Sequence, residues 1–333
     1  MNQLDQLFED LYEETLTEAQ QTNENVDKKE VLQHLLGDFT YLEQKRIEMK
    51  AEQLETKEFA SYKRERISLS VTDKIYIRVY VLTPKKAQKQ YPSMLAIHGH
   101  GYGVNEAVGL TANGEEEKGK PSIHNQFAVE LAKRGFKVFA PEVIGFGTRR
   151  LTRDIEADKL NSCEAMATSL LLEGKTLTGL RVWEARAMLD YMVSCSDVDS
   201  NKIGMMGFSG GAVITTYTAV LDERVQATIL TGFPNTFKGS IMARRHCIDN
   251  YIPGILQYGE LPDWIRLIAP RSLFIESGEN DPLFPSLYAK KAIAAIATQY
   301  DTKSDAFAYD IFPGGHEICG RQSYDWLRKQ LID

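Results

Sequence analysis

The chain has 333 residues, enough for one large α/β domain or two ordinary ones. Its 46 Asp and Glu residues outnumber its 39 Lys and Arg residues, and the net charge is −7. A negative charge of this size argues against nucleic acid or an anionic membrane surface as the main partner.

The N-terminus lacks the basic and apolar regions of a secretory signal, and no uncharged run approaches the roughly 20 residues that span a bilayer. We therefore expect a cytoplasmic protein. The four cysteines lie far apart in the sequence and form no Cys-x-x-Cys pair; they are Cys163, Cys195, Cys247 and Cys319. Free thiols are expected, with no metal site and no cofactor.

The first sixty residues carry apolar side chains at helical spacing, which predicts two or three amphipathic helices. These side chains are Leu4, Leu7, Phe8, Leu11 and Tyr12, followed by Val31, Leu32, Leu35, Leu36, Phe39 and Leu42. Residues 1–62 are therefore interpreted as a helical extension that precedes the main domain, residues 63–333. We expect the extension to pack on the core; the alternatives are that it covers the site or forms a homodimer contact.

Two stretches of alternating apolar and polar residues come next, 67–71 and 75–81, on either side of a turn around Thr72 and Asp73. Such alternation is typical of half-buried strands. The pattern predicts an antiparallel hairpin at the start of the main domain.

Later strands differ in character, because six segments are mostly apolar on both faces, as in a parallel sheet covered by helices. They are residues 94–97, 137–140, 203–206, 227–230, 273–275 and 308–312. Helical stretches at 124–134, 178–193 and 287–299 lie between them. The sequence predicts an α/β fold: a mostly parallel sheet with an antiparallel N-terminal hairpin and helices on both faces.

Two intervals are too long for simple connections and are interpreted as inserts near residues 145–175 and 234–269. Long inserts at the strand ends where ligands bind usually shape the pocket.

The segment from Lys202 to Ala212 reads KIGMMGFSGGA: an apolar strand, a Gly-x-Ser-x-Gly turn and the start of a helix. This pattern is typical of the nucleophile elbow of serine hydrolases. Gly207 and Gly211 leave room where the strand and helix backbones approach each other. We interpret Ser209 as the nucleophile; a plain glycine-rich turn is the alternative.

A serine nucleophile needs an imidazole to take its proton and a carboxylate to orient that imidazole. His316 follows the last predicted strand and is the only histidine downstream of Asp281. Asp281 lies in a polar turn directly after an apolar strand, although a turn-forming role is its alternative. Glu279 and Asp310 are the rival carboxylates. We predict Ser209, His316 and Asp281 as the catalytic residues.

The tetrahedral intermediate of acyl transfer needs two hydrogen-bond donors. One should be the backbone N–H of Gly210, which begins the helix after the nucleophile. The other should come from the loop His98-Gly99-His100-Gly101, which resembles the oxyanion loop of esterases. We assign it to the His100 backbone, with Gly101 as the alternative. His98 and His100 lack the Cys or carboxylate pattern of a metal site, and the glycines do not match a dinucleotide-binding fingerprint.

Substrate contacts are predicted from position alone. Five side chains in the expected loops are candidates to line the pocket: Tyr102, Glu142, Arg149, His246 and Tyr251. For each, surface packing or a structural salt bridge is the alternative. Arg149 with Arg150 would suit a carboxylate on an acidic substrate.

Together these motifs resemble the α/β-hydrolase superfamily, and within it the dienelactone-hydrolase-like and acetyl-xylan-esterase-like bacterial proteins, from about residue 90 to the end. The matching segments are 98–101, 140–147, 199–204, the elbow, the Asp281 turn, Gly315-His316, and the insert segment 246–251. The resemblance implies the α/β-hydrolase fold and a Ser209–His316–Asp281 triad that acts on esters of small acyl groups without a cofactor. True dienelactone hydrolases use a cysteine nucleophile, so dienelactone ring opening is not expected here.

The sequence thus predicts a serine carboxylesterase that cleaves small-molecule esters through an acyl-enzyme. A serine peptidase is one alternative, although such enzymes usually carry a larger substrate-selecting domain. A non-catalytic ligand-binding protein on the same fold is the other. Such proteins commonly lose a triad member, whereas all three candidates are present here.

Overall fold

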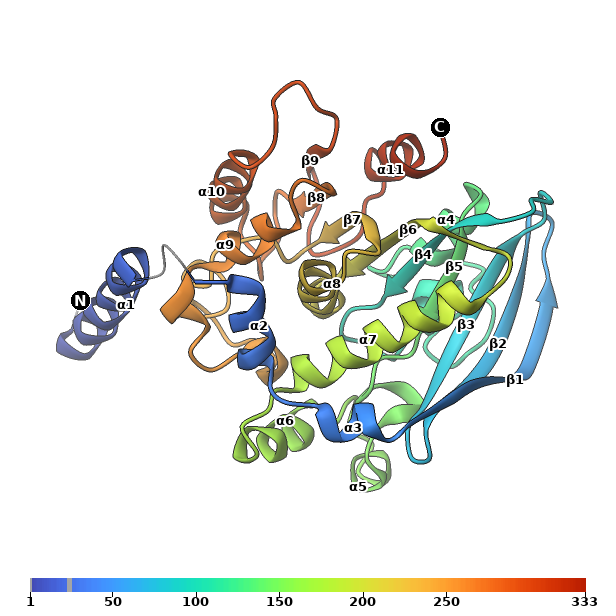
Figure 1. Ribbon diagram of the computed structural model, residues 1–333, viewed down its shortest axis with the longest axis horizontal. Coiled ribbons are helices and arrows are strands. Elements are labelled where there is room, and N and C mark those ends of the chain that lie inside the picture. Colours follow the sequence, from blue (N-terminus) through green and yellow to red (C-terminus); the bar gives the residue numbers. More distant parts are fainter. Residues whose placement is uncertain (1, 23–25) are drawn as a thin grey trace.

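Within residues 2–22 and 26–333, which the computed structural model describes, nine strands form one sheet in the order β1-β2-β3-β5-β4-β6-β7-β8-β9 (Figure 1). The strands are β1 Arg46–Glu58, β2 Tyr62–Thr72, β3 Tyr76–Pro84, β4 Tyr91–Ile97, β5 Lys137–Pro141, β6 Val198–Phe208, β7 Val225–Thr231, β8 Ser272–Gly278 and β9 Phe307–Phe312. The first three strands and the β3–β5 pair are antiparallel, and β5, β4 and β6–β9 run parallel. All six predicted parallel strands are confirmed.

The antiparallel end of the sheet contains the predicted hairpin, in which Ile67 of β2 faces Val79 of β3. It also contains β1, where the sequence predicted part of a helical extension. That prediction is wrong for residues 46–58: they form an edge strand whose side chains are almost all exposed. An exposed, charged edge strand has no apolar alternation, so its sequence carries no strand signal.

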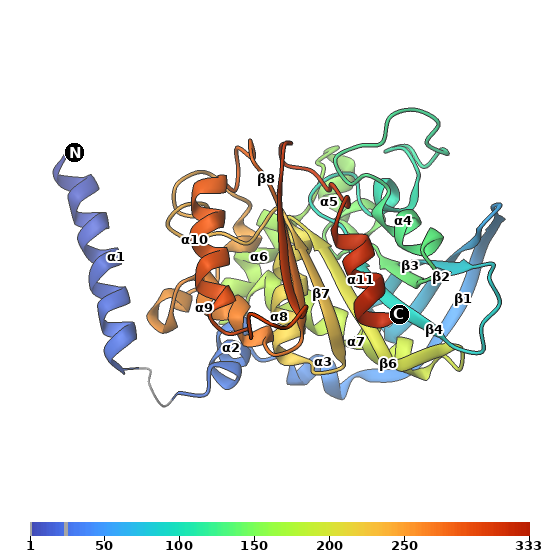
Figure 2. The ribbon, with the colours of Figure 1, turned by 90° about the horizontal axis from the view of Figure 1, so that it is seen from above.

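Each parallel strand sends alternate side chains into two hydrophobic clusters. Leu95 and Ile97 of β4 join the cluster beneath α7 and α8, whereas Met94 and Ala96 join the cluster beneath α4 and α11. Figure 2 shows helices on both sides of the sheet. Burial on both faces explains why these strands read as continuous apolar runs.

The helices on the sheet are α4 Phe127–Lys133, α7 Leu177–Ser194, α8 Gly210–Leu221, α10 Ser286–Ala297 and α11 Ser323–Leu331. At the N-terminus lie α1 Gln3–Thr22, α2 Lys28–Leu36 and α3 Thr40–Gln44. Leu32 and Leu36 of α2 are buried in the core, as expected for an extension that packs on it. By contrast, α1 lies at the edge of the molecule, far from β1, in both Figure 1 and Figure 2.

The two long intervals form local structure at the carboxyl ends of β5 and β7. The first contains the 3₁₀ turn η2 Gly147–Arg149 and the helices α5 Thr152–Glu156 and α6 Cys163–Leu172. The second contains η3 Ile248–Asn250, η4 Ile255–Tyr258, α9 Leu261–Ile265 and η5 Arg266–Ile268. The two inserts touch, since Cys163 Sγ lies 3.6 Å from Asp249 Oδ2.

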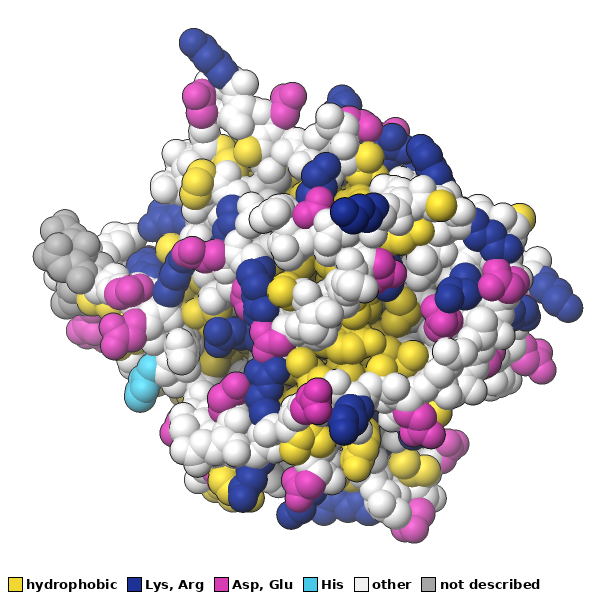
Figure 3. Space-filling view, turned by 45° about the vertical axis from the view of Figure 1, so that its right-hand side comes forward, with side chains coloured by type: hydrophobic (Ala, Val, Ile, Leu, Met, Phe, Trp, Pro, Cys, Tyr) yellow, Lys and Arg dark blue, Asp and Glu magenta, His cyan; other side chains and the backbone are white. Residues whose placement is uncertain are grey.

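Of the helices in the described residues, none is long and apolar enough to cross a membrane. On the face shown in Figure 3, hydrophobic side chains gather at the centre, and cationic and acidic side chains are interspersed around them. This face therefore offers no continuous basic track for a phosphate backbone.

Candidate active site

Ser209 lies at the sharp turn between β6 and α8, with φ 52° and ψ −119°, a strained conformation for a residue with a side chain. A Cβ atom at Gly207 would lie 2.4 Å from Gly211 O, and one at Gly211 would lie 2.2 Å from Ile97 O. The two glycines therefore have the close backbone approach that the sequence predicted.

His316 links Ser209 to Asp281. Its Nε2 lies 2.9 Å from Ser209 Oγ, and its Nδ1 lies 2.7 Å from Asp281 Oδ2. The other Asp281 oxygen accepts the N–H groups of Leu283 and Phe284 at 2.8 and 2.9 Å, which fixes the orientation of the carboxylate. The structure therefore brings the three predicted catalytic residues into one chain of hydrogen bonds, with the geometry of a nucleophile, base and orienting acid.

The rival carboxylates lie elsewhere. Asp310 is paired with Arg321 through two contacts of 2.6 Å, and Glu279 is exposed. Among the described residues, the imidazole nitrogens of His316 contact Asp281 and Ser209 and neither rival carboxylate.

Aromatic rings surround the imidazole. Phe284 stacks on His316 with centroids 5.7 Å apart, and Phe208 lies on it at 4.9 Å. His246 in turn contacts Phe284 at 5.1 Å, so this predicted substrate residue lies beside the site. Its half-buried ring has a pKa lowered by burial, and its Nε2 has no hydrogen-bond partner among the described residues. His246 therefore offers a neutral imidazole next to the catalytic chain.

The loop after β4 lies against the elbow, because a Cβ atom at Gly210 would come within 2.6 Å of His100 Nδ1. The predicted oxyanion residues His100 and Gly210 are thus neighbours. Gly210 belongs to the first turn of α8, where N–H groups have no partner within the helix. Such N–H groups suit a developing oxyanion.

Two buried histidines hold this loop. His124 accepts the Gly99 N–H on its Nε2 at 3.2 Å, and its other nitrogen faces Glu106 at 3.3 Å. His98 accepts the Val143 N–H at 2.9 Å, and burial lowers its pKa to about 3, which keeps the ring neutral. His124 was missed by the sequence analysis because it precedes a helix with no motif around it.

Glu142 and Arg149 were predicted to bind substrate, and their contacts favour a structural role instead. Glu142 accepts the backbone N–H of Thr148 at 3.1 Å and thereby closes the loop at the start of the first insert. Arg149 forms a buried ion pair with Glu184 of α7 and donates to Glu142 O at 2.9 Å. Both side chains are occupied by the fold, and the idea that Arg149 grips an acidic substrate loses its support.

The remaining two candidates are surface tyrosines. Tyr102 is 52% exposed, in the loop after β4. Tyr251 is 43% exposed, and its hydroxyl donates to Ile241 O at 3.0 Å. The structure leaves both accessible without bringing either to the triad.

The side chain of His100 has neighbours that the sequence analysis did not anticipate. Its Nε2 lies 3.0 Å from Asp249 Oδ2, and both cysteines of the inserts, Cys163 and Cys247, are close by. Burial disfavours a charged imidazole, but the Asp249 carboxylate outweighs burial and raises the pKa of His100 to about 9. No local signal reveals this cluster, because its members come from three separate segments of the chain.

Residues 11–306 match the sequence model of the Abhydrolase family. The chain belongs to this family. Membership confirms the predicted α/β-hydrolase fold and the prediction of a hydrolytic enzyme. Within curated proteins, the YtaP protein of Bacillus subtilis (strain 168), named as a hydrolase, is 27% identical over 260 residues, which cover 76% of this chain and 83% of YtaP.

Solved structures of esterases share the fold at low sequence identity. A Bacteroides fragilis NCTC 9343 protein assigned as an acetyl xylan esterase has a TM-score of 0.71 at 17% identity, covering 92% of this chain and 87% of its own. Acetyl xylan esterase 1 from Thermoanaerobacterium sp. JW/SL YS485 has a TM-score of 0.59 at 16% identity, with coverage of 93% and 94%. A glucuronoyl esterase from Solibacter usitatus has a TM-score of 0.61 at 16% identity, and the match covers 85% of this chain and 86% of that protein.

Proposed function

We propose that this Abhydrolase family protein is a serine carboxylesterase that hydrolyses small esters with short acyl groups, acetyl esters in particular. The observation that carries the proposal is the chain of hydrogen bonds from Ser209 through His316 to Asp281 at a strained elbow. The acetyl group is suggested by the shared fold with acetyl xylan esterases.

In this mechanism Ser209 Oγ attacks the ester carbonyl carbon while His316 Nε2 takes the hydroxyl proton. The carbonyl oxygen becomes an oxyanion, for which the backbone N–H groups of Gly210 and His100 are the proposed donors. Asp281 stabilises the imidazolium through Nδ1. His316 then protonates the departing alcohol, and a water activated by the same imidazole hydrolyses the acyl-Ser209 bond.

His246 is the proposed substrate-positioning side chain. Two observations support this role: its Nε2 has no hydrogen-bond partner among the described residues, and its ring contacts Phe284, which stacks on His316. A neutral group of this kind suits a carbonyl or hydroxyl of an uncharged ester.

The test is to label the purified protein with a fluorophosphonate probe and to map the adduct by mass spectrometry. We expect a Ser209 adduct and hydrolysis that declines from acetyl to decanoyl esters. Ser209→Ala should lower kcat/KM by about four orders of magnitude or more. Ser200→Ala, an exposed serine at the start of β6, serves as the matched control.

Wild-type turnover by Ser209→Ala would overturn the nucleophile assignment. Faster turnover of aminoacyl anilides than of acetyl esters would show a peptidase instead. Absence of both the adduct and any turnover would point to a binding protein on this fold.

A further inference from the structure

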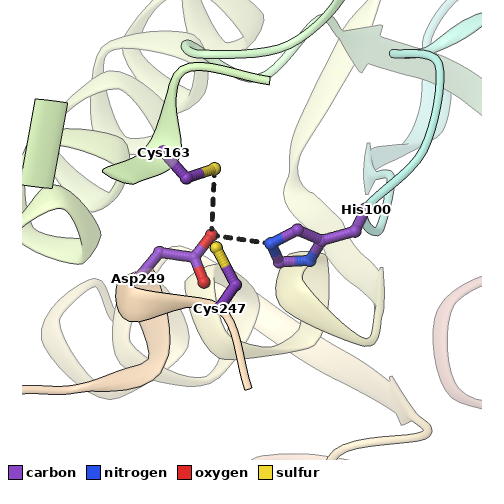
Figure 4. Close-up of side chains that lie close together, drawn as sticks. All are labelled: His100, Cys163, Cys247 and Asp249. Atoms are coloured by element: carbon purple, nitrogen blue, oxygen red, sulfur yellow. Dashed lines mark hydrogen bonds and ion pairs between the residues drawn. The ribbon is translucent and has the colours of Figure 1, made fainter. Parts of the chain in front are cut away.

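Beside the proposed active site, three separate segments bring together four side chains that commonly bind metal ions. His100 comes from the loop after β4, Cys163 is the first residue of α6, and Cys247 and Asp249 come from the η3 region (Figure 4). One ligand atom from each side chain lies within 4.8 Å of all the others. Cys163 and Asp249 are buried, whereas His100 and Cys247 are partly exposed as whole residues.

The spacing of these atoms suits a tetrahedral ion. With metal–ligand bonds of about 2.0 Å to nitrogen and oxygen and about 2.3 Å to sulfur, tetrahedral zinc separates N from O by about 3.3 Å and S from O by about 3.5 Å. His100 Nε2 lies 3.0 Å from Asp249 Oδ2, and Cys163 Sγ lies 3.6 Å from the same oxygen. Only small movements would therefore seat an ion between them.

The His100 nitrogen is a further indication. It lies 3.0 Å from Asp249 Oδ2, at ion-pair distance, yet this buried atom completes no hydrogen bond within the described part of the chain. A buried polar atom without a hydrogen bond needs a partner that accounts for it. A metal ion would displace the proton from this nitrogen and bind its lone pair.

The charge of the surroundings also fits a divalent cation. Two thiolates and one carboxylate carry three negative charges in the metal-binding form. Arg181, a fully buried residue of α7, supplies one positive charge, donates to Cys163 Sγ at 3.2 Å and pairs with Asp249 Oδ2. Two negative charges remain, which one divalent ion would neutralise. Hydrogen bonds that other side chains make to the ligand residues, such as those of Arg181 to Cys163 and Asp249, orient and retain metal ligands.

We propose that His100, Cys163, Cys247 and Asp249 form a zinc site that joins the loop after β4 to both inserts. One nitrogen, two sulfurs and one carboxylate oxygen match the preferences of zinc rather than those of calcium or magnesium. With four protein ligands the site has no open position, so the ion is structural and takes no part in bond breaking.

One consequence depends on the proposed esterase function: the ion would fix the backbone of His100, which is the assigned oxyanion donor. The site itself does not depend on that function, because metal binding is measured without a substrate.

The experiment uses the untagged full chain, stripped of metal with a chelator and kept reduced. Titration with zinc against a chromophoric chelator should show one strong site per chain. Titration with Co²⁺ should produce sulfur-to-cobalt charge-transfer absorption and the intense visible bands of four-coordinate cobalt. The cobalt measurement is made on the unmodified protein, so it stands even if a variant fails to fold.

Cys247→Ser should weaken zinc binding by at least about tenfold and reduce the charge-transfer band. Cys195→Ser and Cys319→Ser replace the two cysteines outside the cluster and should leave both signals unchanged. Absence of a thiolate–cobalt band in the wild-type chain would overturn the proposal. So would equal weakening by Cys195→Ser, or a Cys163–Cys247 disulfide in protein that binds no zinc after reduction.

Discussion

Asp281 illustrates how a single residue sets the protonation of the site. Its Oδ1 accepts two backbone N–H groups, so in Asp281→Asn the amide carbonyl must stay there and the NH₂ group must face His316 Nδ1. Because the NH₂ group donates to Nδ1, the imidazole proton must sit on Nε2. A protonated Nε2 cannot accept the proton of Ser209. We expect kcat for an acetyl ester to fall by about 10³- to 10⁴-fold with little loss of thermal stability.

Glu279→Gln is the matched control for this prediction, because it makes the same chemical change in an exposed carboxylate two residues away. It should leave kcat within about twofold of wild type. The reverse result, with Glu279→Gln inactive and Asp281→Asn active, would transfer the role of orienting acid to Glu279.

Glu276 is a single residue that we expect to make the stability of the fold depend on pH. The residue is fully buried, and burial raises the pKa of its carboxyl although Thr231, Ser323 and the Gly320 N–H all donate to it. The unfolded chain therefore ionises first as the pH rises, so stability is full below the ordinary Glu pKa and falls as pH increases towards the raised value. Glu276→Gln keeps a neutral amide in place. We expect it to unfold at higher urea than wild type at pH 8 but not at pH 4, with Glu279→Gln showing no such difference.

Among single residues, the sequence was informative for those whose place in the fold follows from the order of the strands. Ser209, Asp281 and His316 each follow a strand end, and the parallel sheet brings those ends to one edge. Arg149 was misassigned because its partner Glu184 lies on α7, and that pairing depends on how the helix packs on the sheet. The cluster around His100 was missed for the same reason.

Among the elements, the backbone at the end of β8 lies in close contact with the backbone of the loop that carries His316. A Cβ atom at Gly278, the last residue of β8, would lie 2.0 Å from Gly315 O. Gly278→Ala must therefore displace the His316 loop, and we expect a loss of about 1–3 kcal/mol in the free energy of unfolding together with lower kcat. In Gly315→Ala the added Cβ would have no atom within 4 Å, so its thermal stability should stay close to wild type. Similar melting temperatures for the two variants would contradict this close packing.

β1, one of the elements that the sequence did not predict, shows where patterns fail. Parallel strands were recognisable because both of their faces are buried, and α7 and α10 because each occupies an interval between two such strands in the sequence. Residues 46–58 pair with β2 through the backbone, as in Glu52 opposite Ser68, and apart from Arg46 and Met49 their side chains are exposed and free to be charged. Backbone pairing at a sheet edge leaves little trace in side-chain type.

At the scale of the whole molecule, the N-terminal segment divides into parts with different attachment. α1 is held by polar contacts: Tyr12 donates to Glu260 at 2.9 Å, and Lys238 reaches Glu13 at 3.0 Å. Four of its apolar side chains are exposed, namely Leu4, Leu7, Phe8 and Leu11. A homodimer contact, one of the alternatives for the extension, would use this face, and sedimentation of the full chain against a chain without α1 checks it.

α2 is attached quite differently, and this decides where the protein can be shortened. Leu32 and Leu36 are buried in the core, and Leu36 O accepts both the N–H and the hydroxyl of Thr176, the N-cap of α7. A chain that begins at Val26 should therefore unfold at nearly the wild-type urea concentration. A chain that begins at Lys45 loses two buried leucines, each worth about 2–5 kcal/mol, and should be less stable by about 4 kcal/mol or more. Equal stability of these two chains would support a domain boundary at residue 62; the expected difference would place α2 within the hydrolase domain.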